Sequence, residues 1–395
     1  LPVFSKGCSD ITKVVTKMIV VPPWLLLLSL VRTLPTNSVS MPNIVELECF
    51  TDDATLVRTA DSLYKAEQLL AAARVLRQVR NPGQFLTDHH LKVLRIAEVF
   101  EDAIEAFLAP PGEEWKKQGE SHGSYETSIY YKIESGGRLT CRIETPIPKD
   151  MLVPILSVLN ESSLYPTWIP SWTRPVRLGV RNSKQVLNDR KGHQVIHIQC
   201  DVPWPMASRE VFMDVIAVDD IEETGCIIAK MQTIEEHGDQ DSILLPDGFV
   251  LPRPEKGSER VDFDGSILFR ACPTDHPLYE ASRQKLSGDL ILLQYTMYFD
   301  AKMAAVPHSV INFVTRVVIG MIWSMLLKVA EEVKNGQREE HAHIIREKAD
   351  FYGWLERRCE LMLNSPGIVR KTTPLSLETS QQSDWTMKDI LKLSI

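Results

Sequence analysis

The sequence lacks the cysteine spacing that marks a disulfide framework or a zinc site. Its seven cysteines are an odd number, widely scattered, and no two of them form a C-x-x-C pair. Both kinds of site are therefore excluded, and thiols of this kind indicate a reducing, cytoplasmic setting. The chain also lacks an excess of positive charge, because its formal net charge is -8 at pH 7. This balance excludes a global attraction to nucleic acid.

Common catalytic motifs are absent as well. The sequence contains no G-x-S-x-G, P-loop, G-x-G-x-x-G or H-E-x-x-H, each of which would point to a known reaction chemistry. His193 and His197 are four residues apart, but they fall in a predicted strand, where they share one face with no third metal ligand nearby in the sequence. We therefore expect no enzyme, no metal and no cofactor.

The first apolar run is too short for a membrane span. Residues 18–31 are apolar but are interrupted by Pro22 and Pro23, whereas a spanning helix needs about 20 apolar residues. Basic residues before the run are typical of a signal peptide, while Met41 opens a segment that looks like an ordinary start. Residues 1–40 are therefore either a targeting segment or an artefact of the gene model, and they stay outside the fold prediction.

What remains has the composition of a globular protein, with 44% hydrophobic and 24% charged residues. Residues 52–108 carry apolar side chains at three-and-four spacing, which predicts helices. Asn81, Pro82 and Gly83 break the pattern, so residues 41–110 are expected to form a helical N-terminal region built on a hairpin.

After Pro110 and Pro111 the apolar period changes to two, which predicts strands. A long apolar helix is then expected over residues 309–333, where Arg316 and the charges at its end favour a helix lying over a pocket rather than a membrane span. A charged helix over residues 337–363 and a loose tail follow. This order predicts an α+β fold. The strands are expected at residues 125–133, 139–143, 176–180, 194–202, 209–218, 226–234, 262–271 and 290–299.

Two stretches make a family resemblance specific. Residues 201–212 read DVPWPMASREVF and residues 300–312 read DAKMAAVPHSVIN. They resemble the START (steroidogenic acute regulatory protein-related lipid-transfer) family. The first stretch is similar to the family's loop that leads into a strand beginning with an Arg-Asp pair. The second is similar to the junction between the family's last strand and its last helix. Glu210 stands where the family has aspartate. The resemblance implies a helix-grip fold over residues 113–335, a curved antiparallel sheet around a long C-terminal helix, with residues 336–395 as an added helix and tail.

The resemblance implies that one lipid binds in an internal tunnel, gated by an omega loop and the last helix, and is transferred through transient, peripheral contact with a membrane surface. The lipid class stays open among phospholipid, sterol and sphingolipid. Arg209 would meet a head group or pair with a surface acid. The alternative is a scaffold or lipid sensor that acts through protein partners of the N-terminal helices. Expected gate or membrane contacts are Pro203, Trp204, Pro205 and Met206. Expected lipid contacts are Tyr131, Ile143, Ile198, Arg209, Val211, Met213, Val215, Met231, Tyr295, Met297, Phe299, Val314 and Met321.

Overall fold

The computed structural model describes residues 52–134, 139–171, 177–202, 207–234, 249–300 and 308–364, without the side chains of residues 120–122 and 308–315. Residues 1–40 and the predicted gate residues at 203–206 lie outside this part. The described strands are β1 (Lys116–His122), β2 (Glu126–Ile133), β3 (Leu139–Pro148), β4 (Gly179–Arg190), β5 (His193–Asp201), β6 (Ser208–Asp220), β7 (Cys226–Thr233), β8 (Ser258–Arg260), β9 (Asp262–Ala271) and β10 (Leu290–Asp300). The described α-helices are α1 (Asp53–Lys65), α2 (Leu69–Leu76), α3 (Pro82–Phe85), α4 (Asp88–Leu108), α5 (Leu152–Asn160), α6 (Tyr165–Trp168), α7 (Tyr279–Lys285), α8 (His308–Lys334), α9 (Glu339–Glu347) and α10 (Ala349–Asn364).

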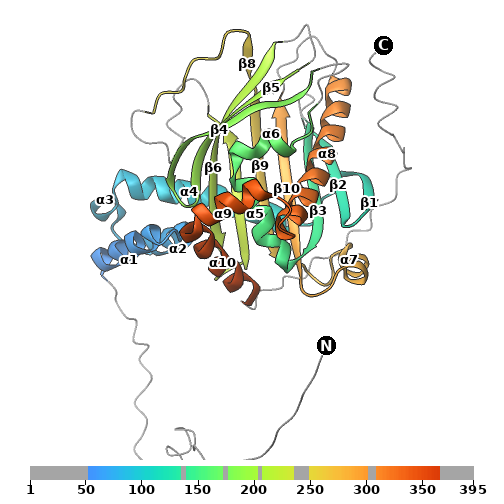
Figure 1. Ribbon diagram of the computed structural model, residues 1–395. Helices are drawn as coiled ribbons and strands as arrows, with labels where there is room; N and C mark the ends of the chain where they lie inside the picture. The colour runs from blue at the N-terminus through green and yellow to red at the C-terminus, as the bar shows by residue number, and fades with distance from the viewer. Residues whose placement is uncertain are drawn as a thin grey trace, which may run out of the picture. The chain divides into compact units, whose positions relative to one another are not determined.

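The strands form one sheet in the order β1-β2-β3-β10-β9-β7-β6-β5-β4. Neighbours along this path pair antiparallel, and the short β8 lies off the path, parallel to β6. Helices cover both sides of the sheet (Figure 1). The predicted α+β class, a large antiparallel sheet with a long helix near the C-terminus, is confirmed.

The two faces of the sheet pack against different helices because side chains alternate along each strand. We call the face that packs on α5, α8 and α10 the inner face, and it carries Ile143, Ile267 and Leu293. The opposite, outer face packs on α2 and α4, and α1 packs on α2. In Figure 1, α4 passes behind the strands. On β6, Ile216 and Val218 belong to this outer cluster.

Helix α8 lies on the β3–β10 side of the inner face. The indole of Trp323 stacks on Tyr295 with ring centroids 5.8 Å apart, and its Nε1 donates to Thr145 Oγ1 at 2.9 Å. Leu326, Leu327, Val329 and Ala330 are buried in the same core. No helix in the described part, α8 included, is long and apolar enough to cross a membrane.

The N-terminal helices differ from the predicted hairpin at one point. The apolar spacing that predicts helices before the break at Asn81 is divided between α1 and α2, because the chain turns at Glu67, which has a left-handed φ of 67°. Leu69, Leu70 and Ala73 of α2 are buried against the outer face. The turn lets α1 pack on α2, which in turn packs on β6.

A buried polar cluster attaches α4 to the outer face. Arg142 of β3 donates to the carbonyls of Phe107 and Ala109, both at 3.0 Å, at the C-terminal end of α4, where carbonyls lack helical partners. Its Nε also donates to Glu144 at 2.8 Å. Burial alone would raise the pKa of Glu144, but the hydrogen bond from His276 and the charge of Arg142 lower it to about 2. Glu144 is therefore ionised at neutral pH.

Candidate functional site

A cavity of about 630 Å³ lies between the inner face of the sheet and helices α5 and α10. Its floor is formed by β6 and β7, where Val215, Ala217, Ala229 and Met231 follow the inward phase of the two strands. Ile267 of β9 extends the floor. The cavity therefore lies on the β4–β9 half of the sheet, beside the half that α8 fills.

A pair of alanines keeps this floor open. Ala217 of β6 and Ala229 of β7 are direct cross-strand partners, so two of the smallest side chains stand next to each other. Ala217 is exposed although its chain neighbours Ile216 and Val218 are buried on the other face. A close-packed interior does not leave such a gap, so the space is a feature of the inner face.

The walls of the cavity are apolar and aromatic. Leu156 and Leu159 come from α5, and α10 contributes Phe351, Trp354 and Leu355. The three α10 residues have the three-and-four spacing that places side chains on one helix face. That face is turned toward the cavity.

One end of the cavity is lined by uncharged amides. Gln185 Nε2 donates to Gln194 Oε1 at 2.7 Å, and Gln194 Nε2 donates to the carbonyl of Asn160 at 3.4 Å. Gln194 is 8% exposed and lies on the inward phase of β5. These amides can accept from and donate to a polar group of a bound molecule.

A buried histidine between two carboxylates lies beside this end of the cavity, on the outward phase of β5, because His193 is the cross-strand partner of Ile216. His193 is hydrogen-bonded to Asp189 at 2.5 Å and to Asp214 at 2.8 Å. Burial disfavours the protonated ring, but the hydrogen bonds and charges of Asp214 and Asp189 raise the pKa of His193 above its ordinary value. The ring thereby links β5 and β6, and both of its nitrogens are engaged by protein groups. Asp214 Oδ2 is buried without a hydrogen-bond partner among the described residues.

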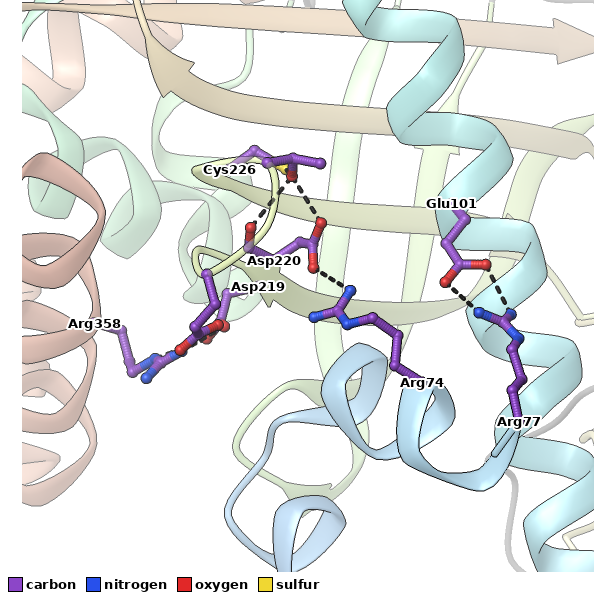
Figure 2. A network of polar contacts seen from close by, with 9 residues as sticks. Arg74, Arg77, Glu101, Asp219, Asp220, Cys226 and Arg358 are labelled. Carbon is purple, nitrogen blue, oxygen red and sulfur yellow. Dashed lines mark hydrogen bonds and ion pairs between the residues drawn. The ribbon is translucent and has the colours of Figure 1, made fainter. Parts of the chain in front are cut away.

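The charged groups at the rim are compensated by one another. Arg190 contacts Glu67 at 2.8 Å, and Arg358 of α10 contacts Asp219 at 2.5 Å. Figure 2 shows Arg358 and Asp219 facing one another at the β6–β7 turn. Lys191 is exposed, and its Nζ lies 5.1 Å from the centre of the Trp354 ring. The cavity therefore presents apolar walls, neutral amides and mostly paired charges.

Helix α9, which precedes α10, holds a second unusual histidine. His341 is fully buried, and neither ring nitrogen has a hydrogen-bond partner among the described residues. Burial lowers the pKa of His341, and the nearby charge of Arg338 lowers it further, while Glu161 and Glu340 oppose this. The ring is therefore neutral at pH 7.

The predicted lipid contacts divide into three groups. Val215 and Met231 line the cavity. Val314 lies in α8 but its side chain is outside the described part, and Met321 is half-exposed on the same helix. The other predicted contacts lie elsewhere on the inner face, in the cores shared with α8 and α6: Tyr131, Ile143, Ile198, Val211, Met213, Tyr295, Met297 and Phe299.

Arg209 also follows the inward phase of β6, but its charge is satisfied by protein groups. Its Nη1 donates to the carbonyl of Ala207 at 2.6 Å and lies 3.2 Å from the Glu259 carboxylate. Arg209 thus pairs with an acid in this structure, and its contact with a lipid head group stays a prediction.

Several lining residues had no sequence prediction. The amides Gln185 and Gln194 and the α10 residues Phe351 and Trp354 were not singled out. The three-and-four spacing of Phe351, Trp354 and Leu355 was a usable signal for a buried helix face. It gave no indication of which surface the face would cover. Among the described residues, no group of three or more His, Cys, Asp or Glu side chains is arranged to hold a metal ion.

No family model matches the sequence, and no curated protein matches it. Among solved structures, the chain is similar to human STARD10, with 12% identity and a TM-score of 0.44 over 65% of this chain and 86% of that one. It is also similar to human StAR-related lipid transfer protein 5, with 13% identity and a TM-score of 0.43 over 62% and 98% of the two chains. A STAR-related lipid transfer protein from Xanthomonas axonopodis matches with 15% identity and a TM-score of 0.38 over 55% and 99%. These are START-related proteins, the family that the sequence resembles, and the functional argument below rests on the cavity itself.

Proposed function

We propose that this protein binds one lipid molecule in the cavity between the inner sheet face and α10, and transfers it between membranes. The observation that carries the proposal is the cavity of about 630 Å³ over the Ala217–Ala229 pair. Sites for small molecules have volumes of roughly 300–1,000 Å³ and are mostly apolar with a few convergent polar groups. The cavity matches that description in size and in lining.

The lining favours an amphipathic ligand. Each methylene that leaves water for the apolar walls contributes about 0.8 kcal/mol, so an acyl chain or a sterol ring system supplies most of the affinity. The amides of Gln185 and Gln194 lie where a hydroxyl or carbonyl of the ligand can be hydrogen-bonded. Phospholipid, sterol and sphingolipid all carry such groups, and the ligand is expected to leave chemically unchanged.

Transfer also requires contact with a membrane. Trp204 and Met206 are the proposed contact, since tryptophan favours the membrane interface and the flanking Pro203 and Pro205 restrict the loop. The long helix α8 is proposed to move with this loop during uptake. In this proposal the protein is cytoplasmic and touches the membrane peripherally.

Native mass spectrometry of the full chain, purified from a lipid-rich host, tests the proposal. A one-to-one lipid adduct is expected, and extraction followed by lipid analysis identifies its class. Recovery of the same lipid after prolonged incubation tests that no reaction takes place. Protein that carries no lipid and takes none from mixed vesicles would refute lipid binding and favour a scaffold that acts through the N-terminal helices.

A further inference from the structure

Helix α10 lies outside the region that resembles the START family, yet it forms one wall of the cavity. Phe351 and Trp354 are only half-buried, although they point toward the inner face, because the cavity lies in front of them. Further along the helix, Leu355, Cys359 and Met362 are buried in the inner core. Phe351 and Trp354 therefore face the cavity, while Tyr352 between them is buried in the inner core.

The start of α10 is attached to α5 by a buried carboxylate. Glu161, 3% exposed, follows directly after α5. Its Oε2 accepts from Lys348 Nζ at 2.7 Å, and its Oε1 accepts from Tyr352 Oη at 2.6 Å. Hydrogen bonds to charged groups are among the strongest in proteins, and leaving such a carboxylate unpaired is costly. We call this set the Glu161 anchor.

The middle of α10 is attached to the sheet by a second carboxylate. Arg358 donates from Nε and Nη2 to the two oxygens of Asp219, at 2.8 and 2.5 Å. This bidentate pair is drawn in Figure 2, with Arg358 reaching from α10 to the β6–β7 turn. Asp219 is the next inward residue of β6 after Ala217, so the contact lies at the edge of the cavity floor. We call it the Asp219 anchor.

We propose that α10 is a lid: Phe351 and Trp354 contact the bound ligand, and the ligand enters and leaves when the Glu161 and Asp219 anchors open. Helix α10 is held by polar anchors at two points, and its aromatic face lies over the open cavity between them. Such an arrangement is expected of a helix that closes over a ligand. The inference rests on the proposed function, because it assigns the route of exchange for the same cavity.

Variants of the full chain test the lid without a known ligand. Tyr352→Phe removes one hydroxyl of the Glu161 anchor, and Arg358→Met removes the charge of the Asp219 anchor. The control is Arg77→Met, because Arg77 makes a bidentate pair with Glu101 at 2.7 Å between α2 and α4, away from the cavity. Losing a hydrogen bond to a charged group changes an opening equilibrium by roughly 10- to 100-fold.

Two readouts are measured on each variant. Hydrogen exchange followed by mass spectrometry is expected to be about 10- to 100-fold faster in α10 of the two anchor variants, with α4 and the central strands unchanged. Stopped-flow entry of 8-anilino-1-naphthalenesulfonate, a small apolar dye, is expected to accelerate in the same variants. Arg77→Met should change neither rate, and the double variant Phe351→Ala/Trp354→Ala should weaken dye binding.

The outcomes separate the lid from the proposed function. Exchange and dye entry that stay at the wild-type rates in Tyr352→Phe and Arg358→Met overturn the lid, even if the protein carries lipid. Exchange that rises equally across the whole chain also overturns it, because α10 would then not open alone. If the protein carries no lipid but dye entry still responds to the anchors, the lid stands and the lipid proposal fails.

Discussion

Filling the cavity floor is the most direct test of the proposed ligand site. Ala229 projects into the cavity from β7, beside Ala217 of β6. A phenylalanine at position 229 would place its ring in space that the structure leaves open, so it should displace ligand without disturbing packed neighbours. Ala229→Phe therefore separates ligand binding from folding.

The size of the effect follows from the area that the ring takes from the ligand. An aromatic side chain buries about 150–250 Å², and apolar area is worth about 25 cal/mol per Å². A ligand that loses that much contact loses about 4 to 6 kcal/mol. A ligand that shifts within the cavity keeps part of the contact, so we expect Kd to rise at least about 10-fold, which corresponds to about 1.4 kcal/mol.

Two measurements on the same preparations check this prediction. Lipid occupancy is read by native mass spectrometry, and Kd is measured by titration with the lipid recovered from the wild-type protein. Ala281→Phe is the matched control, because Ala281 is exposed on α7. The melting temperature of Ala229→Phe should not fall below that of the wild type. A folded Ala229→Phe protein with full occupancy and an unchanged Kd would show that the ligand does not occupy this cavity.

Three further predictions concern other parts of the chain. Because burial lowers the pKa of His341 below 6.5, the folded state binds fewer protons than the unfolded state, so stability should fall as pH drops below about 6.5. His341→Leu should flatten urea-unfolding stability between about pH 7.5 and 5.5, and an unchanged slope would contradict this. Glu144 has a pKa near 2 against an ordinary 4.5, so it should contribute about 3 kcal/mol to the free energy of unfolding above pH 4.5 and lose this contribution as pH falls toward 2. Arg142→Leu should reduce that acid sensitivity, which urea unfolding at both ends of the pH range measures. Trp204→Ala should slow lipid transfer between vesicles severalfold while lipid occupancy is unchanged, and equal transfer rates would remove the proposed membrane contact.

The inner face of the sheet could be predicted because its strands alternate strictly. Val215, Met231 and Tyr295 follow from a period of two and from the bias toward apolar side chains on one phase. The register that brings Ala217 opposite Ala229 is not a property of either strand alone, since it depends on where the β6–β7 turn is made. The apolar face could therefore be predicted from the sequence, whereas the cavity within it could not.

The strands that the sequence did not indicate are polar ones. Strand β4 reads GVRNSKQVLNDR and lies at an edge of the sheet, paired with β5. An edge strand needs little apolar surface, and polar side chains there protect against edge-to-edge association. Gln185 lies in this strand, where a glutamine carries no signal that it faces a cavity. Gln194 lies in the predicted strand β5, where one polar residue carries no such signal either.

The position of α10 over the cavity could not be predicted from the sequence for a different reason. Helix α10 is charged overall, and its aromatic residues were visible at helical spacing, but the surface they cover is fixed by two distant carboxylates. Glu161 lies 191 residues from Tyr352 and Asp219 lies 139 residues from Arg358. Contacts at such separations follow from the tertiary fold and not from any local pattern.

Alternation along β6 explains how one turn serves both faces of the sheet. Asp219 points to the inner face and binds Arg358 of α10, while the next residue, Asp220, points to the outer face and contacts Arg74 of α2 at 2.6 Å (Figure 2). Consecutive strand residues point in opposite directions, so two adjacent acids attach a helix on each side. The position of the acids relative to the strand phase, rather than their number, is therefore what attaches the lid.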